Sequence, residues 1–358
     1  MIRIEKRIDI PKWMNFVIPI ASVFMALLGG AVLLSSQGIS PIDAYGRIIR
    51  AAFGGSYEFS ETVVKATPIA ISSFAVMLCF TMLIWNIGIE GQAFMGALAA
   101  VAAVRYCYSD NHFFMISTAA LFACIAGGSW AMLAGYFKSK WNVNEIISTL
   151  MLNYIAIRIL EYFVYGPWRD PNSLGFPITE RFPASAKLPQ FFGYRVHAGI
   201  ILAVVLALAV WYVLNVTRWG YEIRVMGENQ KAARYSGMSY TKNVLLVMFI
   251  SGAIGGLAGM TEVTGLHGRL QASFTAKYGY TAIIVAWLSH LRPFVILLSS
   301  LLFGALLIGG EALQIEMGLT LSSVEILQGL VLFFVIGGDF FINYRLKFER
   351  RTSNNYHS

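Results

Sequence analysis

The sequence has few charged residues: Asp, Glu, Lys and Arg make up 13% of it, whereas soluble domains carry about 25%. Apolar residues make up 57%, against about 45–50% in soluble domains. A soluble domain of 358 residues cannot bury that much apolar surface. The same composition excludes a disordered chain, which needs low hydrophobicity and high net charge. An integral membrane protein remains, most simply a helical one.

Cysteine is also scarce. Cys79, Cys107 and Cys124 are the three cysteines, and none belongs to a CxxC pair. This excludes a disulfide scaffold, and the three are interpreted as packing residues. No cluster of His and Cys has the spacing of metal ligands, so we expect no metal site.

Several catalytic and nucleotide-binding motifs are missing. The chain has no Gly-Lys dipeptide and therefore no GxxxxGK[ST] phosphate loop, so it does not bind ATP in that way. It has no HExxH and no GxSxG motif. We therefore expect no catalytic residues and no enzyme.

What the chain does have is a series of long apolar runs. A helix that crosses a bilayer needs about 20 mostly apolar residues. Candidate spans lie at roughly 15–34, 67–84, 88–104, 113–136, 145–165, 198–215, 244–264, 279–290, 294–312 and 324–342. We therefore expect an all-α, polytopic membrane protein with about ten transmembrane helices. Segment 41–65 is too polar to span and is consistent with an interfacial amphipathic helix.

The net charge of +8 is best interpreted as topology, not as a nucleic-acid surface. An even number of spans puts both chain ends on one side of the membrane. Both ends are basic, and the positive-inside rule places them in the cytosol. Arg158 falls inside a predicted span. The terminal basic residues are Arg3, Lys6, Arg7, Lys12, Arg345, Lys347, Arg350 and Arg351.

Two connections between the predicted spans are long. Residues 166–197 hold five prolines and are expected to face outward as an ordered cap. Residues 216–243 are expected to face the cytosol. Neither segment is expected to form a separate domain, so we expect one transmembrane domain over 1–358.

The segment 216–243 contains signals for a short helix. Asn229 is a plausible N-cap, and Gly237 suits the position after a helix end. Residues 230–236 then form about two turns, and Ala232 and Ala233 leave a smooth surface. Such a helix is suited to dock in a groove of another protein, and an ordinary surface helix is the alternative.

Polar residues interrupt the apolar runs between residues 85 and 92. Gly88 and Gly91 can break a helix, and Asn86, Glu90 and Gln92 place polar atoms at the break. Discontinuous helices with such groups often line substrate paths. A short cytosolic turn between two helices is the alternative.

Asn153 and Glu262 are further polar residues at membrane depth. Asn153 follows Glu145 by eight residues, so the two lie roughly on one helix face. In the alternative interpretation, Asn144 caps the helix and Glu145 occupies its first turn. Glu262 lies with His267 near the end of a glycine-rich helix, where His267 is more simply a hydrogen-bonded loop residue.

The same helix carries two overlapping GxxxG spacings. They are formed by Gly252, Gly255, Gly256 and Gly259. Small residues at this spacing let two helices approach closely. The pattern predicts helix packing and says nothing about a substrate.

Several runs together resemble a known family. The chain is similar to permease subunits of bacterial ABC importers, in the branched-chain amino acid/ribose/nucleoside permease family. It is most similar to the simple-sugar and nucleoside branch, and the resemblance covers roughly residues 60–342. It is carried by NIGIEGQAFMGALAA (86–100), NEIISTLMLNYIA (144–156), GPWRDP (166–171), RVMGENQKAARYSGM (224–238), SGAIGGLAGMTEVTGLHGRLQ (251–271) and EILQGLVLFFVIGGDFF (325–341).

The resemblance implies partners and a location. The chain would be one half of a transmembrane dimer in the bacterial cytoplasmic (inner) membrane, paired with a second, homologous or identical permease subunit. A cytosolic ABC ATPase subunit would bind ATP and Mg, so that this chain needs no cofactor. An extracytoplasmic substrate-binding lipoprotein would deliver the substrate. No nucleic acid is expected among the partners.

The resemblance also implies roles for individual residues. The ATPase-coupling loop would comprise Arg224, Gly227, Asn229, Ala232, Ala233 and Gly237. The substrate-pathway candidates are Asn86, Glu90, Gln92, Asn153 and Glu262. The expected function is import of nucleosides or related simple sugars by alternating access, coupled to separate ATPase subunits. The alternative is an ion-gradient-driven secondary carrier that uses Glu90 or Glu262 as its proton or sodium site.

Overall fold

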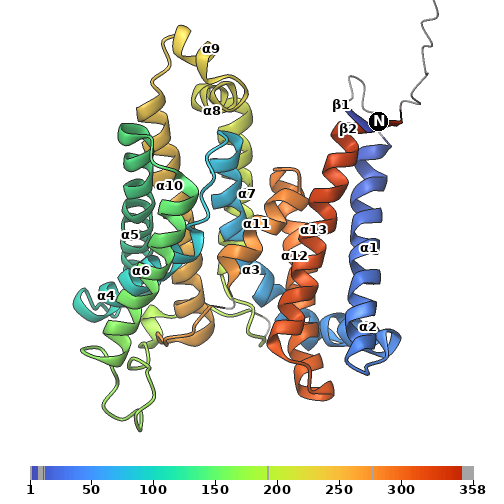
Figure 1. Cartoon of the computed structure of the whole chain (residues 1–358). Coiled ribbons are helices and arrows are strands. Elements are labelled where there is room, and N and C mark those ends of the chain that lie inside the picture. The colour runs from blue at the N-terminus through green and yellow to red at the C-terminus, as the bar shows by residue number, and fades with distance from the viewer. Residues whose placement is uncertain (1, 7–10, 12, 192, 276, 349–358) are drawn as a thin grey trace, which may run out of the picture. The chain divides into compact units, whose positions relative to one another are not determined.

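The computed structural model describes residues 2–6, 11, 13–191, 193–275 and 277–348 (Figure 1). Four of the basic residues behind the topology prediction, Arg7, Lys12, Arg350 and Arg351, lie outside this set. The chain divides into two compact units. One comprises 1–47 and 310–358, and the other comprises 48–309.

The smaller unit joins the two ends of the chain. Helix α1 (Met14–Ser36) packs against α13 (Leu321–Asn343), and a Cβ atom at Gly30 would lie only 2.6 Å from Leu327. After α1 the chain bends by 115° into α2 (Pro41–Phe53). Strands β1 (Ile2–Lys6) and β2 (Tyr344–Phe348) pair in antiparallel fashion, a short sheet that the sequence did not predict.

The larger unit is helical and contains the candidate site. Each predicted span between residues 67 and 312 overlaps one of its helices. Its elements are α3 (Ser56–Thr81), α4 (Ile89–Tyr106), α5 (His112–Trp141), α6 (Glu145–Tyr165), η1 (Ala184–Ala186), α7 (Gly199–Val216), α8 (Arg218–Glu228), α9 (Gln230–Tyr235), α10 (Tyr240–Thr261), η2 (Glu262–His267), α11 (Tyr278–Leu288) and α12 (Pro293–Met317), the last of which continues into the smaller unit.

Six of the described helices are long and apolar enough to cross a membrane, or seven if α1 and α2 count as one bent span. The chain is therefore an all-α, polytopic membrane protein apart from the short terminal sheet. Helix α11 has 11 residues, which reach about 17 Å, whereas the hydrocarbon core is about 30 Å thick. The count of about ten spans and the cytosolic termini stay predictions.

Segment 41–65 is divided between two helices, because α2 ends at Phe53 and α3 begins at Ser56. The polar residues that argued against a span find partners inside the protein. The Thr62 hydroxyl donates to the carbonyl of Ala52 at 2.9 Å, and buried Glu61 pairs with Arg195 at 3.0 Å. The prediction that α3 starts near residue 67 was therefore too late by about three turns.

The predicted GxxxG spacings pack α10 against two neighbours at once. A Cβ atom at Gly256 would collide with the carbonyl oxygen of Ala123 on α5. A Cβ atom at Gly259 would collide with the carbonyl oxygen of Ala93 on α4. The two overlapping motifs thus face different helices, and they bring α4, α5 and α10 into direct backbone contact.

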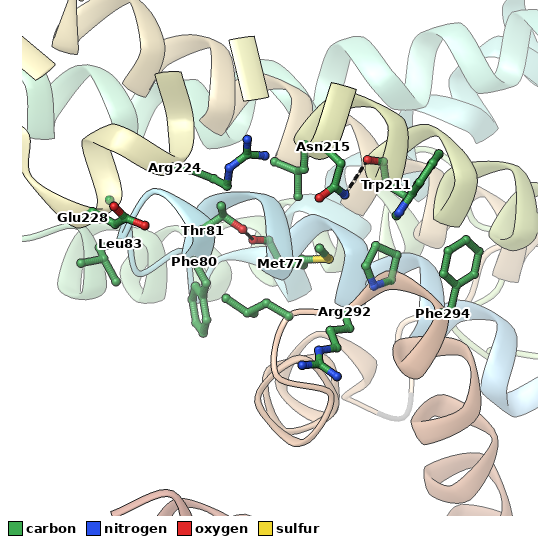
Figure 2. Close-up of a pocket in the computed structure, with 14 residues that line it drawn as sticks. Met77, Phe80, Thr81, Leu83, Trp211, Asn215, Arg224, Glu228, Arg292 and Phe294 are labelled. Atoms are coloured by element: carbon green, nitrogen blue, oxygen red, sulfur yellow. Dashed lines mark hydrogen bonds between the residues drawn. The ribbon is translucent and has the colours of Figure 1, made fainter. Parts of the chain in front are cut away.

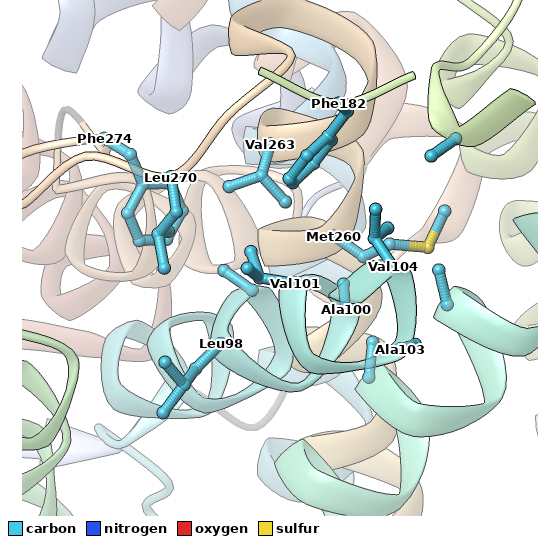
Figure 3. Close-up of a cluster of buried hydrophobic side chains, with 14 of the residues drawn as sticks. Leu98, Ala100, Val101, Ala103, Val104, Phe182, Met260, Val263, Leu270 and Phe274 are labelled. Atoms are coloured by element: carbon cyan, nitrogen blue, oxygen red, sulfur yellow. The ribbon is translucent and has the colours of Figure 1, made fainter. Parts of the chain in front are cut away.

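Segment 166–197 packs over one end of these helices. Buried side chains from α4, α10, η2 and this segment form a common apolar cluster (Figure 3). Phe182 of this segment belongs to the cluster. Backbone hydrogen bonds also join the segment to the chain that follows α10: Thr179 N–H donates to Leu270 O at 2.9 Å, and Leu188 N–H donates to Thr264 O at 3.0 Å. The segment is therefore an ordered cap over the C-terminal ends of α4 and α10, and its outward orientation stays a prediction.

Candidate functional site

Segment 216–243 forms two short helices, α8 and α9, at one end of the larger unit (Figure 1). The side chain of Asn229 caps α9, because its Oδ1 accepts from the N–H groups of Lys231 and Ala232, both at 3.1 Å. The helix ends before Gly237, whose φ of +82° is the left-handed conformation that glycine favours. The predicted cap, helix and stop are confirmed, whereas α8 was not predicted.

Helix α9 presents a small exposed surface. Ala233 is buried against the protein, whereas Ala232 is exposed and Tyr235 is 93% exposed. The two alanines therefore have different roles. Ala233 packs α9 against the rest of the protein, and Ala232 leaves a small side chain on the exposed surface of the helix. A partner that approaches this surface therefore meets the small side chain of Ala232 together with the exposed ring of Tyr235.

Helix α8 ties this surface to the membrane helices. A Cβ atom at Gly227 would collide with the carbonyl oxygen of Thr81, so α8 lies directly on the end of α3. The indole of Trp219 donates to Asn243 Oδ1 at 2.8 Å, and Asn243 Nδ2 donates to Glu222 at 2.9 Å. Because Asn243 belongs to α10, short and partly buried contacts join α8 to both α3 and α10.

A cavity of about 720 Å³ lies beside α8, between the ends of α3 and α7 and the start of α12 (Figure 2). Its wall is mostly apolar and includes Phe80, Trp211 and Phe294. The guanidiniums of Arg224 and Arg292 extend in opposite directions from it. One nitrogen of Arg224, Nη1, is buried and has no hydrogen-bond partner among the described residues.

The break predicted between residues 85 and 92 is present. Helix α3 ends at Thr81 and α4 begins at Ile89. Asn86, fully buried, organises the connection: its Oδ1 accepts from Gly88 N–H and from Gln92 Nε2, both at 3.0 Å. Its Nδ2 donates to Ser251 of α10 at 3.0 Å.

Asn153 holds the break from the side of α6. Its Oδ1 accepts from Gly91 N–H at 2.8 Å and its Nδ2 donates to Ile87 O at 2.9 Å. The Gly91 N–H is one of the N–H groups at the start of α4 that have no partner within the helix. The alternative interpretation of Asn144 and Glu145 is confirmed: Asn144 caps α6, and Glu145 in its first turn pairs with Lys138 at 2.8 Å.

Glu90 joins α4 to the start of α11. Its Oε2 accepts from Gly279 N–H at 2.7 Å, and its Oε1 accepts from the Thr275 hydroxyl. The carboxylate therefore lies at a helix N-terminus, where the helix dipole stabilises a negative charge. Asn86, Glu90, Gln92 and Asn153 thus meet in one buried set that we call the break cluster. The contact of these residues with a substrate stays a prediction.

Glu262 begins the π-helical segment η2 that extends α10. It is 1% exposed, and its Oε2 lies 3.3 Å from His267 Nε2. Neither carboxylate oxygen has a partner with hydrogen-bond geometry among the described residues. π-helical turns are frequent at functional sites. His267 also contacts the carbonyl of Phe274 at 3.1 Å, and the next residue, Thr275, donates to Glu90 of the break cluster.

Sequence reasoning missed His197, which is buried where the cap joins α7. Its ring packs on Gly265 of η2, where a Cβ atom would lie 2.6 Å from His197 Cγ. Its Nδ1 accepts from Gly199 N–H at 3.1 Å, which fixes the neutral tautomer with the proton on Nε2. Burial lowers the pKa of His197 from 6.5 to about 4. The glycines at 199 and 265 are the sequence signal for this contact.

Several known proteins are similar in sequence to this chain over nearly its whole length. The glucose ABC transporter permease protein TsgB13 of Haloferax volcanii is 34% identical, over 98% of this chain and 95% of that protein. The guanosine ABC transporter permease protein NupP of Bacillus subtilis is 33% identical, over 90% of this chain and 93% of that protein. The nucleoside ABC transporter permease protein NupB of Lactococcus lactis is 22% identical, over 90% of this chain and 91% of that protein.

Residues 59–336 match the family described as the branched-chain amino acid transport system / permease component. The matched range includes the break cluster, α8, α9 and η2. It confirms the family that the sequence resembles, and it makes the chain a transport component instead of a catalyst. The chain belongs to this family of ABC importer permeases.

Proposed function

We propose that the chain is the membrane-spanning permease subunit of an ATP-driven importer for nucleosides or related simple sugars. The names of the relatives support this substrate class, since two are nucleoside permeases and one is a glucose permease. The observation that carries the mechanism is the seating of α8 and α9. These helices offer an exposed surface with the small side chain of Ala232, and partly buried contacts join α8 to α3 and α10.

In this proposal α8 and α9 form the coupling element. Asn229 and Gly237 fix the two ends of α9, Ala233 seats it, and exposed Ala232 receives the ATPase. Gly227 lets α8 rest on the end of α3. Arg224 extends from the same helix beside the cavity of Figure 2. Closure of the ATPase then moves α8 and α9 as a rigid body.

The rigid-body motion of α8 and α9 acts on the break cluster. Asn86, Glu90, Gln92 and Asn153 connect the α3–α4 break to α6, α10 and α11. Interrupted helices near the membrane midplane line substrate paths in other transporters. We place the four residues, with Glu262 of η2, along the path that opens and closes between the two states.

The remaining parts of the importer are separate chains. A cytosolic ABC ATPase binds ATP and Mg, a second permease completes the membrane assembly, and an extracytoplasmic lipoprotein delivers the solute. This chain has no cofactor of its own in the proposal. It lies in the bacterial cytoplasmic membrane with about ten spans and both termini in the cytosol, as the basic termini favour.

Uptake by the reconstituted complex tests the proposal. The chain is purified with its ATPase and second permease and placed in proteoliposomes with the binding protein. Labelled guanosine and labelled glucose are then offered with ATP or with a non-hydrolysable analogue. ATP-dependent uptake of at least one solute is expected. Uptake that needs an ion gradient and no ATP would contradict the proposal.

A further inference from the structure

The cavity of Figure 2 lies where three long apolar helices have an end. Helices α3 and α7 end beside it, and α12 begins there. Its wall includes Met77 of α3, Trp211 of α7 and Phe294 of α12. All three helices are candidate spans, so the cavity lies at the level where the hydrocarbon core meets the polar surface of the membrane. Its volume of about 720 Å³ is in the range of sites that hold small molecules.

Two exposed apolar stripes lead from the cavity along α7 and α12. They comprise Val204, Leu208 and Trp211 on α7, and Phe294, Leu298 and Leu302 on α12. Members of a stripe follow one another at intervals of three or four residues, so each stripe keeps to one face of its helix. All six side chains are between 42% and 70% exposed. The rings of Trp211 and Phe294 join the stripes at the cavity, with centroids 6.4 Å apart. The stripes therefore form a continuous apolar surface that begins at the cavity and suits acyl chains.

The cavity also carries positive charge. Its charged lining residues are Arg224, Glu228 and Arg292, so basic groups outnumber acidic ones. Arg224 comes from α8, and Arg292 directly precedes α12, so the two guanidiniums flank the cavity from two sides (Figure 2). Nη1 of Arg224 is buried and has no hydrogen-bond partner among the described residues. A buried charged donor without a partner is costly, so this nitrogen needs an acceptor from outside the chain.

We propose that the cavity binds the head group of an anionic phospholipid, and that the acyl chains of this lipid lie along the stripes of α7 and α12. The guanidinium of arginine is a planar fork of donors that matches the oxygens of a phosphate. Basic pockets between transmembrane helices bind anionic head groups on the cytoplasmic side, where the proposed topology places α8. Free phosphate and nucleotides lack the acyl chain that would cover Trp211 and Phe294. The charge and the apolar surface together therefore specify a lipid.

The bound lipid contacts both α8 and the ends of the membrane helices. Gly227, which lets α8 rest on the end of α3, lines the same cavity. A head group between Arg224 and Arg292 therefore fills the space between α8 and the start of α12 and stabilises the folded chain by mass action. This inference goes beyond the proposed function, because it concerns a lipid and holds for a permease of any solute.

Fluorescence quenching by brominated lipids tests the proposal. The full importer complex is placed in vesicles of phosphatidylcholine, part of which is replaced by brominated phosphatidylglycerol or, in a parallel series, by brominated phosphatidylcholine. Bromine atoms on an acyl chain quench the tryptophans that they contact, and Trp211 lies in the proposed site. We expect stronger quenching by the phosphatidylglycerol than by the phosphatidylcholine at equal content. Trp211→Phe should reduce this difference, because it removes the reporter and keeps an apolar ring.

Removal of the two arginines tests the head-group contact. Arg224→Gln and Arg292→Gln should each lower the affinity for phosphatidylglycerol relative to phosphatidylcholine about 5-fold, the effect of one basic residue beside anionic lipid. Arg292 is exposed, so Arg292→Gln alone keeps the fold and tests the contact by itself. Arg218→Gln is the matched control, because it removes the same charge from the start of α8, and Arg218 does not line the cavity. This control should keep the lipid preference of the parent.

Several results would overturn the proposal. Equal quenching of the parent complex by the two lipids would show that the cavity has no preference for an anionic head group. An equal loss of preference in Arg218→Gln and Arg292→Gln would assign the effect to the general basic surface of this end of the chain. A preference that the isolated chain shows and the complex lacks would mean that the ATPase or the second permease occupies the cavity.

Discussion

Asn153 and Gly91 are joined by a hydrogen bond of 2.8 Å, from the backbone N–H of the glycine to the amide oxygen of the asparagine. The contact needs a glycine, since a Cβ atom at position 91 would lie 2.8 Å from the Asn153 Cα atom. The same amide group donates to Ile87 O on the other side of the helix start. One side chain on α6 therefore bonds both sides of the start of α4, which Asn86 holds from within the connection.

Replacement of Asn153 by leucine should destabilise the protein and reduce uptake. The substitution leaves the Gly91 N–H and the Ile87 carbonyl buried without partners, at a cost of about 1–3 kcal/mol for each group. Thermal unfolding in detergent, followed by tryptophan fluorescence, should show a clearly lower Tm. Ile147→Ala on the exposed face of α6 is the control, since Ile147 is 59% exposed and should have little effect. An unchanged Tm for Asn153→Leu would mean that the hydrogen bonds from Asn153 to Gly91 and Ile87 are not formed.

The surface of α9 gives a prediction about the ATPase. Ala232→Trp should abolish co-purification of the ATPase, because it places a large side chain on the exposed surface of α9 that the ATPase is proposed to contact. The variant chain should still insert into the membrane. Asn229→Ala should weaken co-purification, because loss of an N-cap costs about 1 kcal/mol, and Asn229→Ser should restore it. Pull-down from mild detergent measures both effects.

A tryptophan elsewhere on the surface is the matched control for α9. Asn172 is exposed in the cap and lies outside α8 and α9. Asn172→Trp should leave the amount of bound ATPase unchanged. Equal binding by Ala232→Trp and Asn172→Trp would place the ATPase contact elsewhere on the chain.

The glycines of α10 give a prediction about packing. Gly256→Ala should lower the Tm, because the new methyl group collides with the backbone of α5 and neither backbone can move away alone. Gly46→Ala in α2 is the control, because no atom lies within 4 Å of the added Cβ. Alanine there should be neutral or stabilising by up to about 1 kcal/mol, as in exposed helix interiors. A neutral result at 256 would contradict the close approach of α5 and α10.

Local signals predicted the local structure well. The N-cap at Asn229, the stop at Gly237 and the GxxxG packing of α10 depend on residues a few positions apart, and all three are confirmed. The start of α3 was predicted wrongly because its polar residues are satisfied by distant partners. Glu61 pairs with Arg195, which is 134 positions away, and no local pattern contains that information.

The candidate site shows the same difference between local patterns, which the sequence predicts, and contacts between distant residues, which it does not. The 3.6-residue period placed Glu145 and Asn153 on one face of α6, and both are indeed buried on one face. The period does not tell which partners a buried face meets, so the hydrogen bonds from Asn153 to Gly91 and Ile87 could not be predicted.

The buried His197 predicts a pH dependence of stability. Its pKa is about 4 in the folded protein because burial disfavours the charged ring, against about 6.5 in the unfolded chain. Between these two values the unfolded chain binds the proton and the folded protein does not, so stability falls as the pH is lowered from 6.5 to 4. Below about pH 4 His197 is protonated in both the folded and the unfolded state, so its contribution to stability is absent there. The shift corresponds to at most about 3 kcal/mol at neutral pH.

Unfolding measured between pH 7.5 and pH 4.5 should therefore show a falling Tm in the parent protein. His197→Gln should remove this part of the slope, because glutamine does not titrate. His112→Gln is the control, since His112 is exposed at the start of α5 and should leave the slope unchanged. The same slope in His197→Gln and in the parent would show that the ring is solvated, and the cap would then not be seated on Gly265 of η2 as the structure has it.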